Sequence, residues 1–350
     1  MAIVVVMKKT PLTHRAAVAA IVAVLTLGGV AACSSTTDTG SDTTSSSSSA
    51  STSTDSSSSE TATTSTTDSP DLETLVAEVT DSFEQAIYTD PDTGEELPYN
   101  IYLPEDYDAS KTYPVVLYIA DSSLVGQDVT APLSQYGALI WASDEQQAVE
   151  ESIVIVPEYP DVIIDDHGSY TTTEYVEMTT GLLESIEEQY SVDTSRIYGT
   201  GQSMGAMTVM YLAAHHPELF AAELIVSGQW DPTDLDGLTS ENFLYFAAGG
   251  DENASGGQTD VEALLDTAGV AYGTTTLDAT AAASDQEAAI SELVANGDTA
   301  NFATFETGTV LEVAGTDSDS SMGGSSEHMA SFEPAYKIAA ARAWLLAQTA

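Results

Sequence analysis

Hydrophobic and polar positions divide the chain into a polar first part and a long second part in which two patterns alternate. From Asp71 onward, short apolar runs rich in β-branched residues alternate with longer segments whose apolar residues recur every three or four positions. This alternation continues to the end of the chain, over about 280 residues, and is typical of an α/β fold. The sequence therefore predicts a mostly parallel central sheet flanked by helices.

The apolar runs and helical spacings also predict the individual elements. Two runs at 83–88 and 97–103 flank a turn at 90–94, which predicts an N-terminal hairpin. Further strands are expected at 115–120, 152–156, 196–199, 223–227, 243–248 and 301–305. Helices are expected at 173–190, 206–215, 261–268, 286–295 and 335–346, and 136–149 is expected to be irregular or weakly helical.

The first 70 residues have the composition of an export signal followed by a tether. Basic residues, an apolar run and small residues follow one another over 1–32, which is the order of a secretion signal. Residues 30–33 resemble the lipobox of bacterial lipoproteins, so Cys33, the only cysteine, is the expected lipidation site. Residues 33–70, rich in Ser and Thr, predict a disordered tether, and 71–350 the folded domain. The expected location is the extracellular face of a bacterial membrane, lipid-anchored or secreted.

Charge narrows the range of partners. The chain has 55 acidic residues against seven Lys and Arg, for a formal net charge of −48. Three of the seven cations precede Cys33, so the chain that follows carries about −51. Such a field excludes nucleic acid as a partner and favours neutral or cationic substrates over anionic ones. Solubility, or adaptation to high salt or low pH, accounts for the excess without any specific partner, and the oligomeric state stays open.

A GxSxG motif carries the main chemical signal. Gly201, Ser203 and Gly205 follow a short apolar run and precede a helical one, as the sharp turn of a nucleophile elbow requires. The turn strains the serine backbone, so the positions beside it must be small, and the two glycines meet that need. Ser203 is therefore the candidate nucleophile.

A serine nucleophile needs a histidine as base and a carboxylate to orient it, in the chain order Ser, acid, His. His14 and His167 precede the serine, and His215 and His216 end the helix after it, which leaves His328 in a loop rich in Gly and Ser. For the acid, Asp251 follows a predicted strand at the edge where α/β sheets bind ligands. Asp231 and Asp234 follow the preceding strand and remain its competitors.

The segment from Tyr99 to the C-terminus resembles the α/β-hydrolase superfamily. Within it, the chain is most similar to secreted esterases grouped with polyhydroxybutyrate depolymerases, feruloyl esterases and peptidases of the prolyl oligopeptidase type. The matching stretches are 102–107 with 113–117, 155–157, 193–205, 216–222 and 328–336. The resemblance implies an α/β-hydrolase fold over about 250 residues, with no cofactor and no metal.

Two departures from that family bear on the site. Relatives carry His-Gly after the first long central strand, where one backbone N–H binds the oxyanion, whereas this chain has Ala120 and Asp121. The candidate oxyanion donors are therefore the N–H groups of Ser122 and Met204, and the carboxylate at 121 has to point away. The stretch 272–326 is longer than in relatives and is expected to add a helix and a flexible loop, as a partial lid near the site.

These residues predict a serine hydrolase that cleaves small-molecule or polymeric carboxylic esters through an acyl-enzyme. A serine peptidase of the prolyl oligopeptidase type is one alternative, since the same triad serves both reactions. A surface lipoprotein that binds a ligand without turnover is the other. Trp230 is a candidate wall of the pocket or a core residue, and Asp165, Asp166 and His167 a candidate cation site or a solvated loop.

Overall fold

The computed structural model describes residues 69–315 and 323–350. The predicted signal, the tether up to residue 68 and Cys33 lie outside the described residues. Within the described part, no helix is both long enough and apolar enough to cross a membrane.

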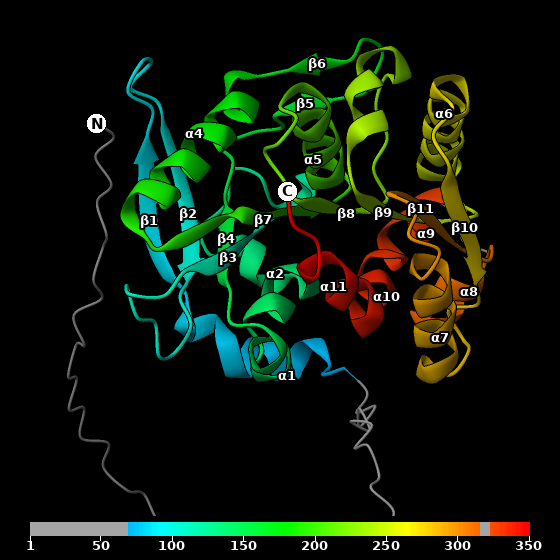
Figure 1. Cartoon of the computed structure of the whole chain (residues 1–350), viewed down its shortest axis with the longest axis horizontal. Helices are drawn as coiled ribbons and strands as arrows, with labels where there is room; N and C mark the ends of the chain where they lie inside the picture. Colours follow the sequence, from blue (N-terminus) through cyan, green and yellow to red (C-terminus); the bar gives the residue numbers. More distant parts are fainter. Residues whose placement is uncertain (1–68, 316–322) are drawn as a thin grey trace, which may run out of the picture. The chain divides into compact units, whose positions relative to one another are not determined.

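A nine-stranded, mostly parallel sheet forms the centre of the domain, as predicted (Figure 1). Its strand order is β1-β2-β4-β3-β7-β8-β9-β11-β10; β2 pairs antiparallel with β1 and β4, and all the other neighbours are parallel. The strands are β1 Glu84–Thr89, β2 Glu96–Tyr102, β3 Tyr113–Ile119, β4 Ile153–Pro157, β7 Val192–Gln202, β8 Ala222–Val226, β9 Phe243–Ala248, β10 Tyr272–Leu277 and β11 Ala300–Phe305. A separate short pair, β5 Ile164–Asp165 and β6 Thr171–Thr172, is antiparallel. The predicted N-terminal hairpin is confirmed as β1 and β2.

Helices cover both faces of the sheet because its parallel strands are apolar on both sides. One face packs against α4 Glu174–Gln189, α5 Met204–His215 and α6 Glu252–Ala268. The other packs against α1 Leu72–Val79, α2 Tyr136–Leu139, α7 Ala283–Val294, α8 Thr309–Val313, α10 Phe332–Lys337 and α11 Ala339–Leu346. In Figure 1 the first group lies above the sheet and the second below it. The remaining helices are α3 Asp144–Val149 and α9 Gly323–Ala330.

Several predicted boundaries are wrong, each for a local reason. α6 begins at Glu252 rather than 261, because the side chain of Asp251 caps it by accepting a hydrogen bond from the Ala254 N–H. The predicted final helix over 335–346 is two helices, α10 and α11, separated at Ile338, whose backbone is extended (ψ 104°). The apolar spacing continues through that break, so periodicity alone does not reveal it.

The stretch 272–326 also differs from its prediction. Residues 272–315 form β10, α7, β11 and α8, which extend the sheet at one edge and cover one face of it. The predicted lid is wrong for these residues, and residues 316–322 of the stretch lie outside the described part. His328 is on α9 rather than in a loop.

Candidate active site

Ser203 lies at the sharp turn between β7 and α5. Its backbone has φ 53° and ψ −117°, a strained conformation for a residue with a side chain, and its N–H donates to the carbonyl of Val226 at 3.0 Å. The flanking glycines leave room for this turn: a Cβ on Gly205 would lie 1.9 Å from the Ile119 carbonyl oxygen, and one on Gly201 2.6 Å from the backbone of Gly205. The predicted strand, turn and helix are confirmed.

Asp251 and His328 meet Ser203 from two other elements. Asp251 follows the end of β9, and His328 lies in the last turn of α9. With its proton on Nδ1, the His328 ring donates to Asp251 Oδ2 at 2.5 Å, and its Nε2 accepts from the Ser203 hydroxyl at 2.8 Å. The Asp251 side chain is 6% exposed and that of His328 25%, so the carboxylate is shielded while the imidazole faces the cavity.

The competing residues point elsewhere. Asp231 accepts hydrogen bonds from Thr233 and caps a short 3-10 helix. Asp234 pairs with His215 at 3.2 Å, and His216 pairs with Glu177 at 2.9 Å. These contacts leave Asp251 and His328 as the acid and the imidazole that the fold brings to Ser203.

A cavity of about 710 Å³ opens beside these side chains. Its lining includes Ser203, Asp251, His328 and both candidate oxyanion residues, Ser122 and Met204. Three further carboxylates, from Asp165, Asp166 and Glu252, line it too, and none of the described residues in the lining is Lys or Arg. Trp230 is 3% exposed and packs edge-on against Tyr170 and Tyr211, so its role as core is confirmed and its role as pocket wall is wrong.

The carboxylate of Asp121 points away from the cavity, as its position requires. It is 3% exposed and is not part of the cavity lining. One oxygen accepts from the Ser123 N–H at 2.8 Å, and the other accepts from the side-chain amides of Gln202 at 2.8 Å and Gln135 at 2.5 Å. These three donors stabilise the buried carboxylate.

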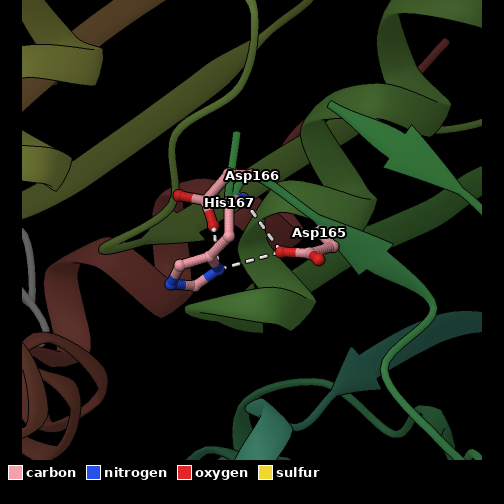
Figure 2. A group of neighbouring side chains, drawn as sticks. All are labelled: Asp165, Asp166 and His167. Atoms are coloured by element: carbon pink, nitrogen blue, oxygen red, sulfur yellow. Dashed lines mark hydrogen bonds and ion pairs between the residues drawn. The ribbon is translucent and has the colours of Figure 1, made fainter. Parts of the chain in front are cut away.

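Asp165, Asp166 and His167 belong to the lining of the cavity. Figure 2 shows their side chains next to one another. Their candidate ligand atoms lie within 4.8 Å of one another. The His167 ring, however, already pairs with Asp165 at 2.8 Å and Asp166 at 3.2 Å, and its side chain is 91% exposed. The hydrogen bond that the His167 ring donates to Asp165, together with the charges of the two nearby carboxylates, raises the pKa of His167, which favours an imidazolium within this group. The contacts match the prediction of a solvated loop.

Two supports of the site escaped the sequence analysis. Glu327, beside His328, accepts hydrogen bonds from the backbone of Gly250 and Gly308. Ser331 donates to the His328 carbonyl at 2.7 Å and also lies 2.7 Å, hydroxyl to hydroxyl, from Ser227. Ser227 directly follows β8 and has φ 53°. No local pattern marks these residues, because each acts on a segment far away in the chain; only the position of Glu327 next to the candidate histidine was a signal.

Comparison with known families agrees with this geometry. The model of a family described as "Esterase: Putative esterase" matches residues 91–319, which is more than half of the chain. The chain belongs to this esterase family. The family belongs to the α/β-hydrolase superfamily, so the predicted fold class is confirmed.

Individual relatives match only part of this chain or only its fold. Dipeptidyl-peptidase 5 of Porphyromonas gingivalis is 31% identical over 157 residues, which is 42% of this chain and 21% of that protein. Probable acetylxylan esterase A of Neosartorya fischeri is 52% identical over 40 residues, 11% of each chain. The chain thus spans about a fifth of the length of the first relative and a tenth of the second. A solved structure titled as a thermostable esterase has a TM-score of 0.57 and 23% identity over 78% of this chain and 64% of its own, which shows a shared fold.

Proposed function

We propose that the protein hydrolyses carboxylic esters through a serine acyl-enzyme, with Ser203, His328 and Asp251 as its triad. The observation that carries the proposal is the unbroken line of hydrogen bonds from Asp251 through His328 to Ser203 at the cavity. A serine hydroxyl is a weak nucleophile near neutral pH. The imidazole of His328 lies 2.8 Å from the Ser203 hydroxyl and is oriented by a buried carboxylate, which is the arrangement that removes the hydroxyl proton.

The reaction proceeds in two steps. His328 Nε2 takes the hydroxyl proton of Ser203 as Oγ attacks the ester carbonyl, and then gives that proton to the departing alcohol. Asp251 stabilises the imidazolium that forms in between. Water then attacks the acyl-enzyme with His328 again as base, which releases the acid and restores the serine. Neither step needs a metal or an organic cofactor.

Two backbone N–H groups supply the oxyanion site in this proposal. Met204 is the first residue of α5, so its N–H is among those that have no partner within the helix, and Ser122 begins the 3-10 helix after β3. Both residues line the cavity beside Ser203. Donors fixed by the backbone stabilise the charge of the tetrahedral intermediate without reorganising during the reaction.

The substrate we propose is a neutral or cationic ester, either a small molecule or an accessible group on a polymer. The carboxylates of Asp165, Asp166 and Glu252 in the cavity lining oppose an anionic substrate, as does the net charge of the whole chain.

Replacing Ser203 by alanine tests the proposal of a serine hydrolase. The wild-type protein is expected to react with a fluorophosphonate probe and to hydrolyse nitrophenyl acetate, and Ser203→Ala is expected to lose both. Ser291→Ala, on the exposed side of α7, is the matched control. A wild-type protein that takes no label and is inert toward short-chain esters would favour the alternative of a ligand-binding surface lipoprotein.

A peptidase is the second candidate, favoured by the similarity to the Porphyromonas gingivalis dipeptidyl-peptidase. The same triad cleaves amides, so the triad does not separate the two reactions. Turnover of a nitrophenyl ester should be compared with that of the matching nitroanilide. A larger kcat/KM for the amide would replace the ester hydrolase with the peptidase.

We also propose that Cys33 carries a lipid and holds the enzyme at the extracellular face of a bacterial membrane. The support is the order of basic, apolar and small residues before Cys33. Expression of the full chain with Cys33→Ser should then release the enzyme from the membrane fraction, and a variant that stays there would contradict the anchor.

A further inference from the structure

The carboxylate of Glu327 joins the two loops that surround the candidate acid. Its Oε2 accepts from the Gly250 N–H at 3.0 Å, and its Oε1 accepts from the Gly308 N–H at 3.0 Å. Gly250 directly precedes Asp251 at the end of β9, and Gly308 lies in the loop after β11, which is the parallel neighbour of β9. A single side chain thus spans the carboxyl ends of two adjacent strands.

Close packing shows that this contact is built into the loops. Glu327 is 5% exposed, and a Cβ on Gly250 would lie only 2.1 Å from its Oε1 and 2.4 Å from its Oε2. Only glycine at position 250 lets the carboxylate approach the backbone so closely. Because Glu327 is bonded directly to His328 along the chain, its two hydrogen bonds tie the segment that carries the imidazole to the segment that carries Asp251.

The other side of the histidine is held as well. Ser331 donates to the His328 carbonyl at 2.7 Å, and its hydroxyl lies 2.7 Å from that of Ser227 at the end of β8. The side chains of Glu327 and Ser331 therefore connect the segment that carries His328 to the residues that follow β8, β9 and β11.

We propose that Glu327 is a positioning residue that sets the distance and orientation of His328 relative to Asp251 and Ser203. This rests on the proposed function of the triad. Proton transfer depends steeply on the geometry of donor and acceptor. A carboxylate that accepts from two backbone N–H groups fixes two loops at once, and so it can set that geometry. Glu327 does not line the cavity, so its loss should change the chemical step more than substrate binding.

Steady-state kinetics on the full chain with nitrophenyl acetate test this role. In Glu327→Gln one carboxylate oxygen becomes an amide group that cannot accept, so one of the two loops is released; Glu327→Ala releases both. We expect kcat to fall about tenfold and about a hundredfold, respectively, with KM changed less than about twofold. Glu327→Asp, which keeps the charge on a shorter stem, should lie between Glu327→Gln and the wild type. Glu333→Gln, the same change on an exposed residue of α10, is the matched control and should keep the wild-type kcat.

A second variant disturbs the same contact from the other side and leaves the carboxylate in place. Gly250→Ala puts a methyl group where Glu327 lies, so it should also lower kcat about tenfold. In the Glu327→Ala background that space is free, so Gly250→Ala should lower kcat less than about twofold. This coupling distinguishes a specific contact from general destabilisation. If Glu327→Ala folds poorly, Gly250→Ala in the wild-type background and Glu327→Gln still test the contact.

The outcomes separate the two proposals. Wild-type kcat in folded Glu327→Gln and Glu327→Ala would overturn the positioning role while the triad stands. Equal costs of Gly250→Ala in both backgrounds would overturn it too, because the clash would then not involve Glu327. A wild-type protein without ester turnover or probe labelling would overturn the proposed function instead, and with it any role for Glu327 in that reaction.

Discussion

At the scale of single residues, Asp121 places a buried carboxylate next to the proposed oxyanion donor Ser122. Its carboxylate connects the loop that begins at Ser122 with Gln202, the residue before the candidate nucleophile. A negative charge next to the proposed oxyanion site is tolerated because it faces two glutamine amides and a backbone N–H rather than the cavity. The same contacts connect the two segments that carry the proposed oxyanion donors.

Asp121→Asn should therefore lower kcat for nitrophenyl acetate by about tenfold with little change in KM, since misaligned donors weaken transition-state binding. The new amide would direct N–H groups at the amides of Gln135 or Gln202 and lose one of these bonds. Asp106→Asn, on an exposed loop, is the control. A wild-type kcat in Asp121→Asn would show that the oxyanion donors do not depend on this carboxylate.

At the scale of elements, the turn between β7 and α5 depends on the absence of side chains beside Ser203. Gly205→Ala should lower the free energy of unfolding by about 3 kcal/mol, because its methyl group would overlap the backbone of β3 at Ile119. Chemical denaturation measures the change. Gly256→Ala is the matched control: a Cβ there meets nothing within 4 Å, and alanine in α6 should add about 0.5 to 1 kcal/mol. Equal stabilities for the two variants would contradict the close approach at Gly205.

At the scale of the whole molecule, the excess of acidic residues extends into the interior of the domain, where several glutamates are buried. Burial raises the pKa of Glu223 on β8 well above its ordinary value, with Glu241 adding to the effect, and neither of its oxygens has a hydrogen-bond partner among the described residues. Burial likewise raises the pKa of Glu241 and of Glu158 to about 7. All four Lys and Arg side chains in the described part form ion pairs, with Glu151, Glu150, Glu333 and Glu145.

These raised values predict how stability depends on pH. Glutamates titrate near about pH 4.3 in the unfolded chain, so above that pH the folded state binds more protons than the unfolded one, and stability falls as pH rises through 7. The melting temperature should be higher at about pH 5.5 than at about pH 8. Glu223→Gln should raise it at the higher pH and flatten the dependence, whereas Glu188→Gln on the exposed side of α4 should do neither. Parallel curves for Glu223→Gln and the wild type would show that Glu223 is not protonated in the folded protein.

Much of the fold and part of the site could be predicted because their signals are local. The apolar runs located nearly all strands of the sheet, and the spacing of Gly201, Ser203 and Gly205 located the strained turn, since both depend on neighbours along the chain. β10 was missed because Tyr272–Leu277 is mostly polar and threonine-rich at the edge of the sheet. The early start of α6 was missed because glycine and serine fill its first turns.

The sequence by itself determined the order of elements, the turn at Ser203 and the short set of acids and histidines that could serve it. Only the tertiary structure decided that Asp251, rather than Asp231 or Asp234, meets His328, and that Glu327 holds both loops. The reason is physical: a backbone conformation follows from adjacent residues, whereas a hydrogen bond between side chains more than 70 positions apart depends on how the strands are ordered in the sheet.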